Sequence, residues 1–197
     1  MLTKLTHWLD ARRRERALRE YAIDDELWQA TLKGLPFLRY LSPADCARLR
    51  ETTSLFIAQK EFSTAHGLEL TDEIVVGIAA QACLPVLNLS LDLYRGWVGV
   101  IVYPGEFVIR KTVEDEDGVV HEVEHDASGE AWEGGPVVLS WEDAQLTDGR
   151  DAYNVVIHEF AHKIDMLSGA TDGHPPLFRR WHAPLDAQRW ADVFDHA

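Results

Sequence analysis

The most informative segment of this chain is Asn154-Val-Val-Ile-His158-Glu-Phe-Ala-His162-Lys-Ile-Asp165. It contains the pattern His-Glu-x-x-His. On a helix, positions i and i+4 share one face, so the imidazoles of His158 and His162 converge on one point. Two convergent nitrogen donors are what a tetrahedral Zn²⁺ site requires. The stretch therefore predicts a metal-binding helix with His158 and His162 as ligands.

Glu159 stands beside the first predicted ligand and is the candidate general base. A bound metal lowers the pKa of its water toward neutrality, and a carboxylate within reach can take that proton and later protonate a departing amine. Apolar residues surround the motif, namely Val155, Val156, Ile157, Phe160, Ala161, Ile164 and Leu167. They predict a largely buried helix, in which unpartnered imidazoles and carboxylates would be costly. A surface helix with incidental His and Glu is the alternative.

Asp165 lies one helical turn beyond His162. We expect its carboxylate to support the site, either by accepting a hydrogen bond from a ligand imidazole or by holding the loop at Ser168-Gly169. A role as third ligand stays open, although successive helical turns point these side chains to different depths.

The first half of the chain is predicted to be helical. Helices are expected over residues 4–20, about 24–33, 43 to about 60, and 73–87. Ser42 is a typical N-cap, and Asp72 opens the last, alanine-rich and apolar segment. We expect residues 1–60 to form an N-terminal helical layer and residues 61–197 a catalytic domain, with no flexible linker between them.

The second half has β-type patterning. Strands are expected over residues 98–103, 107–113, 119–123 and 136–140. The acidic segment 115–118 predicts a hairpin turn, and the glycine-rich segment 126–136 predicts a loop. A further helix is expected to begin at Ser140 or Thr147. The predicted class is therefore α+β, with a small mixed sheet, a metal-binding helix on one side and a helical layer.

Charge and composition restrict the partners. The net charge is −14, and the first twenty residues hold six basic and three acidic side chains, so the rest carries −17. Such an acidic body disfavours binding to nucleic acid.

The longest apolar run, 74–87, is interrupted by Gln81 and Pro85 and is too short to span a bilayer. With no secretory h-region and two cysteines interpreted as reduced, a cytoplasmic location without membrane contact is expected.

Four blocks together resemble the Mlc titration factor A family of zinc-dependent peptidases. They are Ala79-Ala-Gln-Ala-Cys83, Tyr103-Pro-Gly-Glu-Phe-Val108, Gly135-Pro-Val-Val-Leu-Ser-Trp141 and His158-Glu-Phe-Ala-His-Lys-Ile-Asp-Met166. The resemblance implies a gluzincin-like, zincin-type domain related to the anthrax lethal factor protease domain, with aminopeptidase-type activity. It also implies that His158 and His162 bind Zn²⁺ and that Glu159 is the base. Because some members bind the glucose-responsive repressor Mlc, it implies two partners, a peptide substrate and a transcriptional repressor.

The resemblance also implies a third ligand that this sequence lacks. In the family it is a glutamate on a later helix, near a tyrosine that steadies the transition state. Here no glutamate and no tyrosine follow Glu159. We therefore expect a C-terminal segment to be missing, zinc to be held more weakly, and catalysis by this chain alone to be uncertain. His174, His182 and His196 are candidate substitutes, for which loop or surface positions are expected.

Two other functions remain open. Peptide deformylases also use His-Glu-x-x-His with a thiolate, and Gly77-Ile-Ala-Ala-Gln81 with Cys83-Leu84 faintly resembles their motifs, but the spacing does not match. The second alternative is a non-catalytic regulator that sequesters a transcription factor.

For a peptidase, we expect an extended peptide to pair with an edge strand. Residues 98–103 or 136–140 are the candidates, with the second favoured because glycines precede it.

Overall fold

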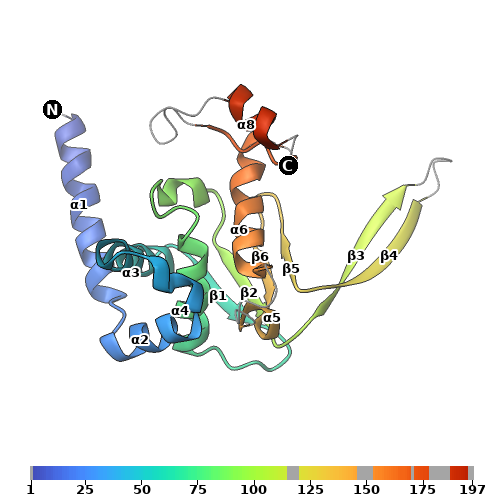
Figure 1. Cartoon of the computed structure of the whole chain (residues 1–197), viewed down its shortest axis with the longest axis horizontal. Coiled ribbons are helices and arrows are strands. Elements are labelled where there is room, and N and C mark those ends of the chain that lie inside the picture. The colour runs from blue at the N-terminus through green and yellow to red at the C-terminus, as the bar shows by residue number, and fades with distance from the viewer. Residues whose placement is uncertain (1, 115–119, 146–152, 170, 178–186, 195–197) are drawn as a thin grey trace.

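The computed structural model describes residues 2–114, 120–145, 153–169, 171–177 and 187–194 (Figure 1). Its N-terminal helices are α1 (Leu2–Glu20), α2 (Asp25–Gly34) and α3 (Pro43–Ile57), with the short 3₁₀ helix η1 (Pro36–Tyr40) before α3. The predicted cap of α3 is confirmed, because Ser42 Oγ accepts a hydrogen bond from Asp45 N at 3.1 Å. Asp24 Oδ1 caps α2 in the same way, accepting from Leu27 N at 2.8 Å.

The buried apolar helix is shorter than predicted. α4 spans Asp72–Cys83, whereas the sequence predicts a helix over 73–87. Pro85 explains the difference, since it has no N–H to donate into a continuing helix. A turn and the 3₁₀ helix η2 (Leu91–Tyr94) follow.

A four-stranded mixed sheet forms the centre of the fold. It contains β1 (Glu61–Thr64), β2 (Gly99–Tyr103), β6 (Val137–Ser140) and β5 (Gly129–Ala131), in that spatial order. β1, β2 and β6 are parallel, and β5 is antiparallel to β6, with Glu130 opposite Val138. The predicted α+β class with a small mixed sheet is confirmed.

The prediction of the edge strand is wrong. The predicted strands 98–103 and 136–140 correspond to β2 and β6, which are both internal strands. The edges are β1, which the sequence did not indicate, and β5, which lies inside the segment 126–136 predicted to be a loop. Gly129, Gly134 and Gly135 lower the strand propensity of that segment, so its sequence predicts a loop.

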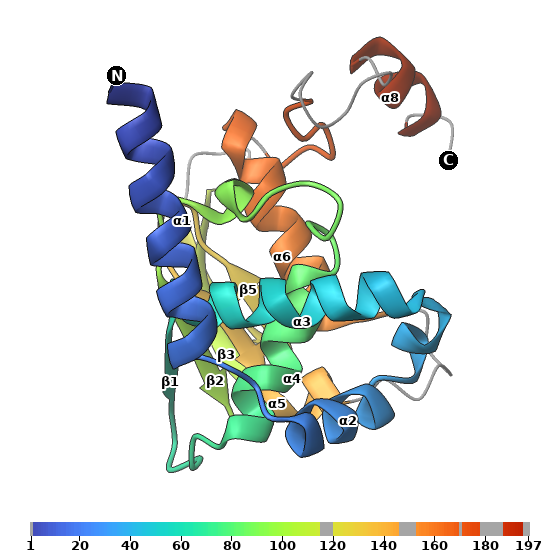
Figure 2. The same ribbon diagram turned by 90° about the vertical axis from the view of Figure 1, so that its left-hand side faces the viewer.

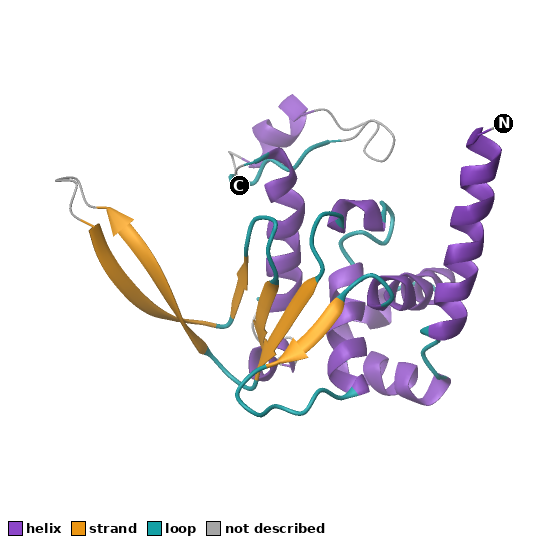
Figure 3. Ribbon diagram, turned by 180° about the vertical axis from the view of Figure 1, so that it is seen from behind, coloured by secondary structure: helices purple, strands orange, loops and turns teal. Residues whose placement is uncertain are grey.

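A long hairpin projects from this sheet. It consists of β3 (Phe107–Glu114) and β4 (Val120–Ala127), paired antiparallel, and it extends away from the helices (Figures 1 and 3). Its predicted turn at 115–118 lies outside the described residues. A single residue, Ser128, separates β4 from β5.

The helices cover one face of the sheet and share its core. α3 crosses in front of α4 and α6 (Figure 2), whereas from behind the strands lie nearest the viewer (Figure 3). Phe160 of α6 packs edge-to-face on Phe56 of α3 and on Tyr94, with ring centroids 5.6 and 5.3 Å apart. Residues before and after position 60 contribute to the same cluster, and the predicted division at this point stays a prediction.

The other helices that the structure describes follow β6. They are α5 (Trp141–Gln145), α6 (Val155–Asp165), the 3₁₀ helix η3 (Met166–Ser168) and α8 (Ala187–Phe194). Ser140 Oγ accepts a hydrogen bond from Asp143 N at 3.2 Å, so α5 begins at the first of the two predicted positions. Within the described parts of the chain, no helix has the length and apolarity needed to cross a membrane.

Candidate metal centre

The helix that carries the motif is fixed at its first residue. Asn154 is the N-cap of α6, and its Oδ1 accepts from Ile157 N at 2.8 Å. Its Nδ2 donates to Gln81 Oε1 at 2.7 Å, and Gln81 Nε2 in turn donates to Ala144 O at 3.3 Å. Gln81 is almost fully buried in α4. One amide pair therefore ties the start of α6 to α4 and α5.

The two predicted ligands converge. The Nε2 atoms of His158 and His162 lie 3.0 Å apart, with the ring planes at 85°. Two ligands of a tetrahedral zinc ion would have their nitrogens about 3.3 Å apart, so a small side-chain movement would admit the ion. Burial, and then repulsion by His162, lower the pKa of His158, which favours the neutral imidazole that a metal needs.

Glu159 is buried beside the edge strand. Its side chain is on the face of α6 that lies against β5, and only 5% of the residue is exposed. A Cβ added to Gly129 would stand 2.6 Å from Glu159 Cγ and 2.8 Å from Glu159 Oε1. Only a glycine allows this approach. Sequence analysis missed Gly129, although a glycine within a short strand is itself a sign of close backbone contact.

Tyr153 is a second neighbour that sequence analysis missed. It directly precedes the N-cap of α6, and its ring centroid lies 5.3 Å from that of His158. Burial, followed by the carboxylates of Glu159 and Asp143, raises the pKa of Tyr153. A neutral phenol therefore stands at the rim of the site at physiological pH.

The described residues supply two candidate metal ligands and no complete set. Among them, no group of three or more His, Cys, Asp or Glu side chains is arranged to hold an ion. Of the three candidate substitutes, His182 and His196 lie outside the described residues, and His174 belongs to the loop after α6. The fit to a metal thus rests on the paired imidazoles and the adjacent buried carboxylate.

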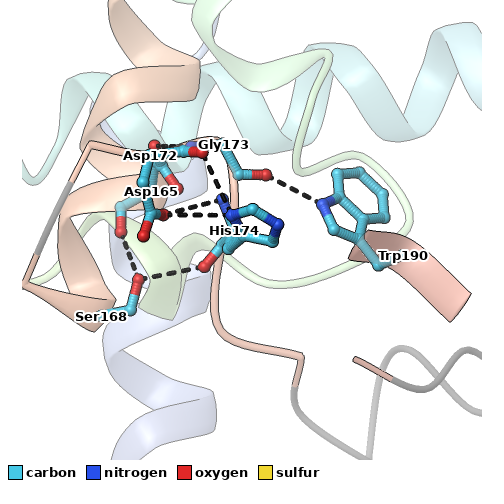
Figure 4. A network of polar contacts seen from close by, with 6 residues as sticks. All are labelled: Asp165, Ser168, Asp172, Gly173, His174 and Trp190. Carbon is cyan, nitrogen blue, oxygen red and sulfur yellow. Dashed lines mark hydrogen bonds and ion pairs between the residues drawn. The ribbon is translucent and has the colours of Figure 1, made fainter. Parts of the chain in front are cut away.

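Asp165 contacts the loop after α6. Its Oδ2 accepts from Gly173 N at 2.9 Å, and Ser168 Oγ lies 2.7 Å from Asp165 O and 3.2 Å from His174 O (Figure 4). Trp190 Nε1 donates to Gly173 O at 2.9 Å, which attaches α8 to the same loop. The carboxylate thus binds the loop at Gly173, whereas Ser168, where the sequence predicts the contact, bonds Asp165 only at its main-chain oxygen. A supporting role of Asp165 at a metal stays a prediction.

A mixed α+β domain whose half-buried helix presents two converging imidazoles and a glutamate has the features of a metallopeptidase. Comparison with known families gives the same class. The family described as glucose-regulated metallo-peptidase M90 matches residues 9–197, and the chain belongs to this family.

Several curated proteins are similar to the chain. An uncharacterized protein of Synechocystis is 38% identical over 192 residues, which cover 95% of this chain and 67% of that protein. Mlc titration factor A of Klebsiella pneumoniae is 38% identical over 150 residues, covering 76% of this chain and 56% of the relative. Mlc titration factor A of Yersinia pestis is 34% identical over 171 residues, covering 86% and 61%. The chain thus spans between about half and two thirds of these relatives.

The family match removes the deformylase alternative. Cys83, its candidate thiolate, lies fully buried in α4, and burial raises the pKa of the thiol. It is therefore a core residue.

Proposed function

We propose that this chain carries the catalytic core of a zinc-dependent peptidase with a zincin-like fold. The observation that supports this most directly is the 3.0 Å approach of His158 Nε2 to His162 Nε2, on the helix that also carries the buried Glu159. Membership of a metallopeptidase family supports the same proposal. Aminopeptidase-type cleavage is the finer proposal, and it rests on the family resemblance alone.

In the proposed mechanism, His158 and His162 are the residues that would hold the ion, since their Nε2 atoms face each other. Zn²⁺, when bound, supplies Lewis acidity toward the scissile carbonyl and toward water. Glu159 takes a proton from the attacking water at its carboxylate and delivers it to the departing amine nitrogen. Its place against Gly129 fixes the carboxylate, so little reorientation is needed between the two transfers.

We further propose that β5 is the strand along which the substrate lies. It ends the sheet on the side of α6, and no described strand pairs with its outer edge. An extended peptide can add to such an edge by main-chain hydrogen bonds. Contact between Gly129 and Glu159 would bring the paired peptide next to the general base.

The experiment combines zinc binding and hydrolysis. Calorimetric titration with Zn²⁺ should give one site in the wild type and in Glu159→Gln, and much weaker binding in His158→Ala. Peptides with free and with acetylated N-termini should be cleaved by the wild type and not by Glu159→Gln, and a preference for free N-termini would support aminopeptidase action. Zinc binding unaffected by His158→Ala would contradict the proposal.

A regulatory function is the second candidate. The relatives from Klebsiella and Yersinia are named Mlc titration factor A, which supports binding of a transcriptional repressor in the cytoplasm. Co-purification of the repressor with both wild type and Glu159→Gln would support binding independent of hydrolysis. A wild type that binds the repressor but cleaves no peptide at saturating zinc would favour a non-catalytic regulator.

A further inference from the structure

Lys163 directly follows His162 and is buried, with 4% of its surface exposed. Its Nζ donates to the carbonyl oxygens of Trp132 at 2.7 Å and Gly135 at 3.0 Å. These two residues form the turn between β5 and β6, in which Gly135 N donates to Trp132 O at 3.1 Å. One side chain of the metal-binding helix therefore holds the turn at the end of the edge strand.

The other end of β5 meets the same helix face. Glu159 and Lys163 are four residues apart and so lie on one side of α6. Gly129, the first residue of β5, contacts Glu159, and Trp132, which follows the strand, binds Lys163. The edge strand is thus attached to α6 at both of its ends.

The ring of Trp97 completes the surroundings of the ammonium group. Lys163 Nζ lies 4.6 Å from a ring centroid of Trp97. Lys60 Nζ lies 3.5 Å from a ring centroid of Trp97 as well. A ring face attracts cations in this arrangement. Lys60 is also buried, but it donates to Tyr94 O at 2.6 Å and to Trp97 O at 2.7 Å, away from the β5–β6 turn.

Packing alone does not account for Lys163. Burying a charged group is costly, and a methionine of similar length would fill the same space without that cost. What the ammonium adds is the pair of hydrogen bonds to the turn. We propose that Lys163 is a positioning residue, which fixes β5 against α6 so that a peptide paired with β5 lies at a set distance from Glu159. The effect of Lys163 on the reaction rests on the proposed function, whereas its hydrogen bonds to the β5–β6 turn do not.

The test compares Lys163→Met with Lys60→Met. Both variants lose a buried ammonium from the Trp97 ring, but only the first loses the bonds to the turn. In Lys163→Met we expect amide hydrogen exchange at Trp132, Gly135 and Ser140 to become at least about tenfold faster, because these amides bond within the β5–β6 hairpin. We expect KM for an extended peptide to rise by about tenfold with a smaller change in kcat.

Lys60→Met should lower stability while leaving hairpin exchange and KM near the wild-type values. Lys163→Arg, which keeps donors and charge, should restore part of the protection and keeps the test usable if Lys163→Met does not fold. Equal effects of Lys163→Met and Lys60→Met on both readouts would overturn the proposal. A wild type without hydrolysis would contradict the proposed function, and hairpin exchange would still decide whether Lys163 holds the strand.

Discussion

Gly129 lies directly against Glu159, so that a Cβ at residue 129 would stand 2.6 Å from Glu159 Cγ. A side chain at position 129 and the side chain of the candidate general base would therefore occupy the same space. We expect Gly129→Ala to displace the carboxylate and to lower kcat by about 100-fold, because misplacement of a catalytic group by about 1 Å has an effect of this size. Zinc affinity should stay within a few fold, since both imidazoles are on the helix.

Gly34→Ala is the matched control, because a Cβ there meets no atom within 4 Å. It should leave kcat unchanged. A Gly129→Ala variant with wild-type kcat would show that Glu159 can shift without consequence, against its assignment as base.

The Asn154–Gln81 pair predicts a stability effect larger than that of a cap alone. Loss of an N-cap costs about 1 kcal/mol, and leaving the buried oxygen Gln81 Oε1 without its donor costs about 1–3 kcal/mol more. We expect Asn154→Ala to lower the free energy of unfolding by about 2–4 kcal/mol in urea titrations. Asp24→Ala, which removes only the cap of α2, should cost about 1 kcal/mol. Equal losses in the two variants would contradict a contribution from Gln81.

Tyr153 is expected to ionise at higher pH than an ordinary tyrosine. Burial contributes most to this shift, and Glu159 and Asp143 add to it, so Glu159→Gln should lower the pKa partway toward its usual value. Ultraviolet difference spectra of wild type minus Tyr153→Phe isolate this group from the other tyrosines. A titration of Tyr153 that is insensitive to Glu159→Gln would contradict the contribution of the Glu159 carboxylate to this pKa.

The lowered pKa of Lys60 predicts that the free energy of unfolding changes with pH in the alkaline range. Burial, and then Lys163, lower its pKa from 10.5 to about 8, so over this range the unfolded chain binds more protons than the folded one. The contribution of Lys60 to the free energy of unfolding should therefore rise with pH across that window. Urea titrations at several pH values should show a shallower rise in Lys60→Met, and an unchanged slope would contradict the shift.

Much of the site was predictable because it depends on helical spacing. The separation of His158 and His162 alone determines that they share a face, and the apolar residues around them predict burial of the helix. The same spacing places Lys163 on the face of Glu159, but lysine in a helix usually indicates solvent exposure. Its role appears only when the carbonyls of Trp132 and Gly135, brought there by the sheet, are known.

The edge strand could not be predicted for a related reason. Strand order depends on contacts between distant segments, and nothing local distinguishes an internal strand of Val137–Ser140 from an edge. Gly129 also lowers the strand propensity of β5. A glycine is needed at this position because the close approach of Glu159 leaves no room for a side chain.

The join between the projecting hairpin and the edge strand has a mechanical consequence. Since Ser128 alone separates β4 from β5, the base of the β3–β4 arm lies within one residue of Gly129 and of the helix face that carries Glu159. The contacts that hold β5 on α6, at Gly129 and at the turn bound by Lys163, therefore also fix the point from which the arm leaves the sheet.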